Sequence, residues 1–128
     1  MSLSSPLRQV LGPGAARSGV QHWWLQRLTS LALLPLTIWF VVSLVALPGL
    51  DHVTVSAWLS QSWTALLLIL LVLIGAWHSQ LGLQVIIEDY VHGQGAKWLL
   101  LVLTRFAHVL VGAAGVFAVL RVALRGVA

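Results

Sequence analysis

The sequence contains no cysteine among its 128 residues. This absence excludes a disulfide framework, thiolate ligation of an iron–sulfur cluster, a covalently attached c-type haem and a cysteine nucleophile. It leaves the redox compartment open. Any cofactor that the chain binds must therefore be held by other kinds of side chain.

Charge is also scarce. Charged residues make up 8% of the chain and hydrophobic residues 59%, and the mean hydropathy is +0.97. A soluble domain carries roughly 25% charged residues. The composition therefore predicts that the chain lies mostly in a lipid bilayer, with one membrane domain at residues 21–128 after an N-terminal cytoplasmic tail at residues 1–20.

Three apolar runs predict transmembrane helices at about residues 28–47, 62–87 and 97–121. Each run is long enough to cross a hydrocarbon core roughly 30 Å thick at about 1.5 Å per residue. Backbone groups in lipid must be hydrogen-bonded within their own segment, so helices are the expected form. We expect an all-α integral membrane protein whose three helices form an up-down-up bundle. No internal repeat points to the inverted-repeat transporters.

Glycine, proline and polar residues mark the ends of these runs. We expect the first 20 residues to be irregular, since they contain several glycines and prolines. In "PGLDHVTVSAW", Asp51 or Thr54 is placed to cap a short amphipathic helix before the second span. In "EDYVHGQGAK", Gly93 and Gly95 are the expected helix breakers.

The seven Lys and Arg side chains are spread along the chain. Nucleic-acid binding needs a clustered basic stripe, so it is disfavoured. Three arginines precede the first span and Lys97 lies in the second loop, whereas two arginines follow the third span. The positive-inside rule predicts a cytoplasmic N-terminus and second loop, with the C-terminus on the outer side. We expect the membrane to be the inner membrane and the outer side to be the periplasm.

His78 is the clearest polar residue inside a predicted span. It lies too deep to reach the interface, and ionisable groups in lipid usually mark a functional site. Gly75 at i−3 and Gly82 at i+4 share its helix face. A stripe without side-chain bulk suits a flat macrocycle ligated by imidazole. It equally suits close helix packing with a hydrogen-bonded histidine, and the spacing leaves both interpretations open.

Asp89 and Tyr90 close the second span. Asp89 follows His78 by 11 residues and returns to nearly the same helix face, about 16 Å farther along the axis. A carboxylate and a phenol at a membrane rim suit a site that exchanges protons and electrons. They equally suit a helix end in the headgroup region with a tyrosine at the interface.

Other polar residues are less decisive. Arg27, at the start of the first span, can bind a lipid headgroup, a haem propionate or a quinone carbonyl. Thr29 can hydrogen-bond back to its own helix and needs no function. His108 is expected to form an interhelical hydrogen bond, although it can in principle supply a second ligand to a haem held by His78. The sequence assigns no role to His22 or Arg105.

Two stretches resemble the hydrophobic membrane anchor subunit of succinate dehydrogenase, the D-type anchor of succinate:quinone oxidoreductases. "HSQLGLQVIIEDYV" is similar to the family's second-helix pattern of His, three residues, Gly, then Gln-Val and an Asp-Tyr-Val ending. "SGVQHWWLQRLTS" resembles the entry into the first helix and places Arg27 on the family's arginine, with His22 one place away from a family histidine. The resemblance covers roughly residues 18–125.

The resemblance implies a haem site. His78 would be one axial ligand of the iron of haem b, with Gly75 and Gly82 making room for the macrocycle and Arg27 near the haem propionates and the quinone. The second axial ligand would come from a partner, the C-type cytochrome b anchor subunit. One internal histidine supplies one ligand, so a partner subunit also completes the bundle.

It also implies a quinone site. Tyr90 would hydrogen-bond ubiquinone, and Asp89 would lie beside it in the site or on its proton path. The two anchors would dock a flavoprotein with FAD and an iron–sulfur protein onto the membrane, in electron transfer from succinate to quinone in the tricarboxylic acid cycle. The chain would contain no catalytic residue and would not be an enzyme alone.

Two other functions remain as alternatives. The chain can be a haem-free structural anchor of a related complex of the fumarate reductase type, in which His78 only joins helices. A small channel or transporter subunit is less favoured, because the carboxylates lie at a rim or in a loop rather than within a span.

Overall fold

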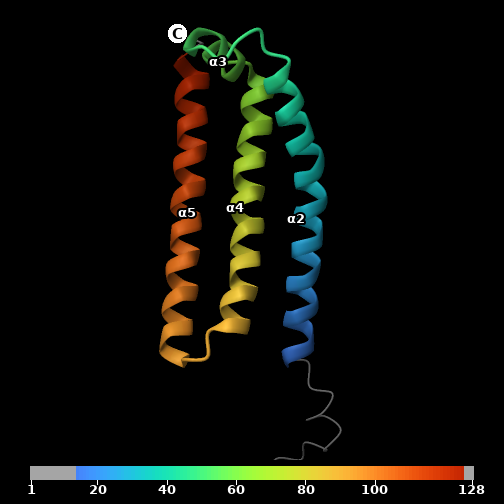
Figure 1. Ribbon diagram of the computed structural model, residues 1–128, viewed down its shortest axis with the longest axis vertical. Helices are drawn as coiled ribbons and strands as arrows, with labels where there is room; N and C mark the ends of the chain where they lie inside the picture. The colour runs from blue at the N-terminus through green and yellow to red at the C-terminus, as the bar shows by residue number, and fades with distance from the viewer. Residues whose placement is uncertain (1–13, 126–128) are drawn as a thin grey trace, which may run out of the picture.

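The computed structural model describes residues 14–125. Within them the elements are α2 (Gly14–Val45), α3 (His52–Leu59), α4 (Ser62–Tyr90) and α5 (Gln94–Arg125), with no strand. Three of these helices are long and apolar enough to cross a membrane. Figure 1 shows α2 and α5 running in the same direction and α4 running against them. The expected all-α, up-down-up architecture is confirmed.

The long helices extend beyond the predicted spans. α2 begins at Gly14, so the irregular tail expected through residue 20 is wrong for residues 14–20; residues 1–13 lie outside the described part. Ala15 and Ala16 are strong helix formers and explain this extension. Gly95 is helical rather than a breaker, since α5 begins at Gln94. Near a membrane, the backbone's need for internal hydrogen bonds outweighs the modest helix propensity of one glycine.

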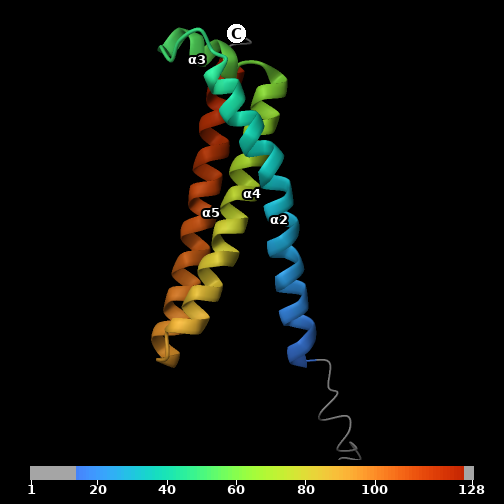
Figure 2. The same cartoon turned by 45° about the vertical axis from the view of Figure 1, so that its right-hand side comes forward.

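The three long helices form a row rather than a closed bundle. α4 packs against both α2 and α5, whereas the backbones of α2 and α5 do not come close to each other within the described residues. Figure 2 shows α2 diverging from α4 and α5 towards its own N-terminal end. α4 is therefore the central helix, with one packing interface towards α2 and another towards α5. We call these interfaces the α2–α4 seam and the α4–α5 seam.

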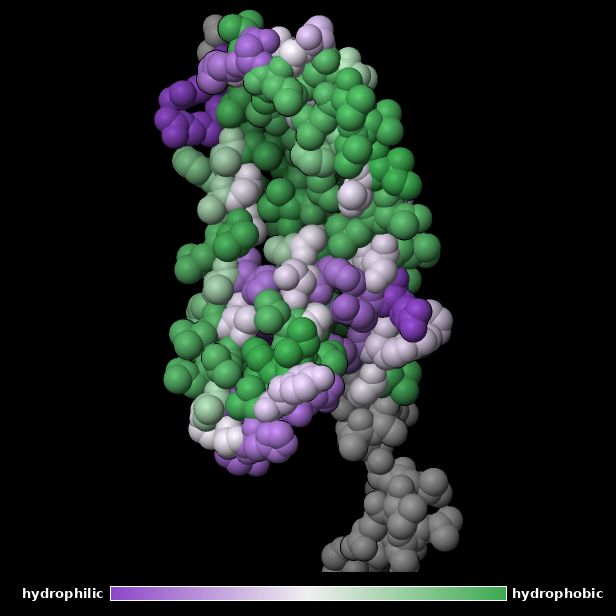
Figure 3. All heavy atoms as spheres, in the orientation of Figure 1, coloured by the Kyte–Doolittle hydropathy of each residue, from purple (hydrophilic) through white to green (hydrophobic). Residues whose placement is uncertain are grey.

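Few side chains are buried within the chain itself. The buried hydrophobic residues of the described part all belong to α4: Ala65, Leu68, Leu81 and Ile87. Figure 3 shows a largely hydrophobic surface, crossed by a band of hydrophilic residues in its lower half. A monomer in water does not expose so much apolar surface, so the bilayer must cover most of these helices.

The short helix α3 lies across the ends of α4 and α5 and contacts both. Asp51 is its N-cap, as expected: Oδ1 accepts hydrogen bonds from the backbone N–H groups of Val53 and Thr54, each at 3.0 Å. The hydroxyl of Thr54 donates to Asp51 Oδ2 at 2.6 Å. The Thr54 hydroxyl, followed by the backbone N–H groups, lowers the pKa of this carboxyl.

Candidate functional site

A single polar contact joins the midpoints of α2 and α4. Thr29 Oγ1 lies 2.9 Å from His78 Nδ1, across a separation of 49 residues. Thr29 is buried, with 8% of its surface exposed, and His78 is half-buried. The histidine of the second span is therefore hydrogen-bonded across helices, as the helix-packing interpretation expects.

Thr29 belongs to a polar row that the sequence analysis missed. His22, Gln26 and Thr29 stand at i, i+4 and i+7, so they share one face of α2. His22 Nε2 and Gln26 Oε1 are buried and have no hydrogen-bond partner within the described residues. Buried polar atoms need partners, so this row has bonding capacity that the described part of the chain does not use. The signal was present in the sequence: a polar stripe in an otherwise apolar helix.

The two glycines beside His78 face α2. A Cβ on Gly75 would lie 3.9 Å from Leu33 Cδ2, and one on Gly82 would lie 3.7 Å from Gln26 Nε2. Both are ordinary van der Waals distances, so the glycines let α2 lie close against α4. This arrangement fits helix packing, and room for a haem at these positions stays a prediction.

Arg27 points away from His78. It precedes Thr29 by two residues, or about 200° around the helix, so it lies on the opposite face of α2. Its guanidinium carbon stands 5.1 Å from the ring centre of Trp23, in a cation–π contact. This outer face has a shallow groove of about 420 Å³ that includes Arg27 and Trp24. Within this chain the structure does not bring Arg27 together with His78.

Asp89 and Tyr90 are the last two residues of α4, and both are exposed, Tyr90 by 78%. Because α4 stays helical to its end, Asp89 lies on the face of His78 and Tyr90 about 120° away from it. His78 and Tyr90 are separated by about 18 Å along the axis. One rigid helix therefore connects the deep histidine to the rim residues without any direct contact.

The connection beyond Tyr90 is held by polar contacts of α4. Lys97 Nζ donates to the backbone carbonyl of Glu88 at 3.0 Å, and Gln84 Nε2 donates to Glu88 Oε1 at 2.8 Å. The Lys97 bond ties the start of α5 to the end of α4, and the Gln84 bond, within α4, holds the Glu88 side chain. The neighbours of Tyr90 are thereby fixed, while its own side chain remains open to the surroundings.

The α4–α5 seam contains the second histidine of the spans. His108 Nδ1 donates to the carbonyl of Thr104 at 2.7 Å, which leaves Nε2 to accept from the Ser79 hydroxyl at 3.1 Å. The expected interhelical hydrogen bond of His108 is confirmed. Both of its ring nitrogens are engaged, so His108 has none left for a metal.

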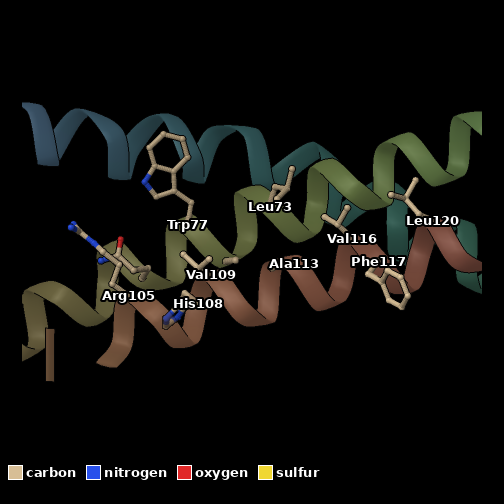
Figure 4. A pocket seen from close by; sticks show the side chains of 12 residues that line it. Leu73, Trp77, Arg105, His108, Val109, Ala113, Val116, Phe117 and Leu120 are labelled. Carbon is tan, nitrogen blue, oxygen red and sulfur yellow. The ribbon is translucent and has the colours of Figure 1, made fainter. Parts of the chain in front are cut away.

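A groove of about 800 Å³ runs between α4 and α5. Figure 4 shows Arg105, His108 and Trp77 near one end of it and Phe117 and Leu120 near the other. His78 and Tyr90 are not among its lining residues. Arg105 thus belongs to a different face of the molecule from the candidate site.

No group of three or more His, Asp or Glu residues within residues 14–125 is arranged to hold a metal ion. A haem needs only one imidazole from each side. His78 meets that lesser requirement: among the described residues its ring makes a hydrogen bond through Nδ1 only.

Three apolar spanning helices with α4 in the middle, a half-buried histidine and an acidic, phenolic rim define a small multi-pass membrane protein. Residues 1–114 match the family model described as succinate dehydrogenase/fumarate reductase transmembrane subunit. The chain belongs to this family.

Curated relatives agree. The chain is 29% identical to a succinate dehydrogenase hydrophobic membrane anchor subunit of Paracoccus denitrificans, over 97% of this chain and 95% of the relative. It is 32% identical to a succinate dehydrogenase membrane anchor subunit of Reclinomonas americana, over 70% and 77%. For a Rickettsia conorii anchor subunit the identity is 33%, over 61% and 63%. The chain thus spans under two thirds of the Rickettsia relative's length.

Proposed function

We propose that the chain is the D-type membrane anchor of a succinate:quinone oxidoreductase, with His78 as one axial ligand of haem b and Asp89 and Tyr90 in the ubiquinone site. Membership of the family supports the anchor role. The observation that carries the haem assignment is the state of the His78 ring, in which Nδ1 is hydrogen-bonded to Thr29 and Nε2 has no partner between residues 14 and 125. Histidines that ligate metals commonly use one nitrogen for the metal and the other for a protein partner.

The residues present fit one side of a haem. His78 supplies one imidazole nitrogen, and the second axial ligand would come from a C-type cytochrome b partner subunit. A bound haem supplies a one-electron carrier whose potential is tuned by its ligands and its burial. Arg27, on the outer face of α2, would meet a propionate or a quinone carbonyl that lies between the subunits.

At the rim, the residues are suited to proton exchange. Quinone reduction needs donors where charge develops on the quinone oxygens. The exposed phenol of Tyr90 can donate a hydrogen bond to a carbonyl oxygen, and the exposed carboxylate of Asp89 can exchange a proton with water. FAD and the iron–sulfur clusters would reside in the flavoprotein and iron–sulfur partner subunits.

A haem-free structural anchor of the fumarate reductase type is the second candidate. The Thr29–His78 bond and the packing of α2 over Gly75 and Gly82 favour it, because each joins the helices without a cofactor.

The visible spectrum of the detergent-purified complex separates the two candidates. We expect a b-type α-band in the dithionite-reduced minus oxidised spectrum, and we expect His78→Ala to alter or abolish it. His108→Ala is the matched control, since it removes the other interhelical histidine and should leave the band unchanged. Absence of the band from the wild-type complex would support the haem-free anchor. A band that survives His78→Ala unaltered would move the ligand elsewhere.

Tyr90→Phe tests the rim. We expect it to lower quinone reductase activity, because the phenol that hydrogen-bonds the quinone is lost, while reduction of an artificial dye acceptor by the soluble subunits continues. An equal loss with both acceptors would point to failed assembly and would contradict a specific quinone role.

The proposed topology is directly testable because the chain has no cysteine to interfere with labelling. We expect a cysteine introduced by Gly95→Cys to react with an impermeant maleimide only from the cytoplasmic side, and one introduced by Leu50→Cys only from the periplasmic side. The reverse pattern would overturn the proposed orientation.

A further inference from the structure

We infer that Thr29 is a positioning residue for His78, which holds the ring in the Nδ1–H tautomer and so keeps the lone pair of Nε2 free for a ligand. That this ligand is a haem iron rests on the proposed function. The tautomer and its control by Thr29 rest on the geometry of the α2–α4 seam alone.

Counting protons around Thr29 assigns the tautomer. Thr29 Oγ1 lies 2.8 Å from the carbonyl oxygen of Leu25, 3.1 Å from that of Gln26 and 2.9 Å from His78 Nδ1. The hydroxyl has one proton to donate and two lone pairs to accept with, whereas a carbonyl can only accept. If the hydroxyl donates to Leu25, its oxygen accepts the Nδ1 proton of His78, and both hydrogen bonds form.

The opposite tautomer forms fewer bonds. With the ring proton on Nε2, the Thr29 hydroxyl must turn towards Nδ1 and give up its bond to the Leu25 carbonyl. The Nε2 proton would then have no acceptor among the described residues. The Nδ1–H arrangement therefore makes one more hydrogen bond and leaves an unpaired acceptor, the form of nitrogen that binds a metal.

Thr29 is also placed to fix the orientation of the ring. It is one of two buried polar side chains in the described part, the other being Thr64. Its branched Cβ limits χ1, and its hydroxyl is held against its own helix backbone. The oxygen that contacts Nδ1 is thus a rigid point, and an imidazole held by it keeps Nε2 in a set direction.

His108 provides an internal contrast. Its Nδ1–H also donates within the chain, to the Thr104 carbonyl, but its Nε2 is occupied by the Ser79 hydroxyl. The two histidines thus share a tautomer and differ in whether Nε2 is free. At His78 the hydroxyl contacts Nδ1, so Nε2 is left to bind a ligand. At His108 the hydroxyl contacts Nε2, so no ring nitrogen is left for one.

The first test reads the tautomer without haem. The full chain, labelled with 15N-histidine and purified in detergent from haem-deficient cells, is examined by NMR, with His78→Ala assigning the resonances. We expect a protonated Nδ1 and an unprotonated Nε2 at His78, retained in Thr29→Ser and shifted towards the other tautomer in the isosteric Thr29→Val. A wild-type His78 protonated at Nε2, or a Thr29→Val spectrum identical to wild type, would overturn the inference.

The second test reads the ligand in the purified complex. A hydrogen bond from Nδ1–H makes the imidazole a stronger donor to the iron, so Thr29→Val should raise the haem midpoint potential and change its low-spin EPR signal. Thr29→Ser should match wild type in both readouts. If the haem depends on His78 and Thr29→Val leaves both readouts unchanged, the positioning role fails by itself. If wild type lacks the haem, the proposed function fails, and the NMR result still decides the role of Thr29.

Discussion

The two seams of α4 differ in how closely the helices pack and in whether their polar groups have hydrogen-bond partners. Against α5, small residues bring the backbones together: Cβ positions on Gly112 and Gly115 would lie 3.7 Å from Ala76 Cβ and 2.7 Å from Val72 Cγ1. The histidine of this seam has both ring nitrogens bonded. Against α2, the seam leaves polar atoms of His22 and Gln26 without partners in the described chain. We call the α4–α5 seam the closed seam because its histidine has no unbonded ring nitrogen, although a groove of about 800 Å³ runs along it. We call the α2–α4 seam the open seam because it keeps polar atoms that can bind a further group.

Gly115→Ala should disrupt the packing of α5 against α4 in the closed seam. It should give the largest change in the free energy of unfolding among these variants. The new methyl group would fall within 3.0 Å of Val72, whose branched side chain cannot turn away freely. We expect a loss of about 1–3 kcal/mol in the free energy of unfolding, the usual cost of overpacking. It can be measured by denaturing the chain from mild detergent with SDS and following its circular dichroism. Gly112→Ala is the control, and an equal loss there would contradict this account.

Gln26→Met, in the open seam, should raise the free energy of unfolding rather than lower it. It replaces a buried amide oxygen that has no partner with an apolar side chain of similar length. Removing an unsatisfied group should stabilise the isolated chain by about 1 kcal/mol. The same unfolding assay measures it. A destabilised variant would mean that a bound water or another partner already satisfies this oxygen.

A pair of double-mutant cycles should show a smaller effect. We expect a coupling free energy of about 0.6 kcal/mol between His108 and Ser79, typical of interhelical hydrogen bonds in membranes. The corresponding cycle for Thr29 and His78, made with Thr29→Val and His78→Ala in the haem-free chain, should give a similar value. Zero coupling in the first cycle would show that the closed seam does not depend on its polar contact.

The Asp51 cap lies outside both seams. Its protonation should give the smallest change in stability, confined to α3. Its lowered pKa means that the folded state favours the carboxylate. The contribution of the cap to α3 is therefore complete above the unfolded-state pKa and is lost as pH falls through the lower folded value. Hydrogen exchange at the Val53 and Thr54 amides should accelerate over that acidic range, relative to the intrinsic rate. Asp51→Asn keeps the cap acceptor and should abolish this pH dependence.

Much of this architecture follows from the sequence. The three spans follow from hydropathy, and a cap at Asp51 or Thr54 follows from the polar residues after Pro-Gly-Leu. The depth of His78 and the shared face of Gly75 and Gly82 follow from helical periodicity. Each of these depends on residues close together in the chain, where local spacing decides the outcome.

The partner of His78 could not be predicted in the same way. Thr29 does bond back to its own helix as expected, yet its second contact lies 49 residues away. Periodicity defines a face of α2 and a face of α4, but the axial offset and rotation between the two helices depend on packing along their whole length. The outward direction of Arg27 could have been predicted, because 200° of helix separates it from Thr29.

The central position of α4 has a thermodynamic consequence. Since the backbones of α2 and α5 stay apart within the described residues, most substitutions on one lie far from the other, and free energies of distant, independent substitutions add. Stability changes from pairs of variants on the outer helices should therefore sum, whereas a variant of α4 can couple to both. Substitutions in α4 therefore change both stability and the candidate site together. Substitutions on the outward faces of α2 and α5 can change stability one helix at a time.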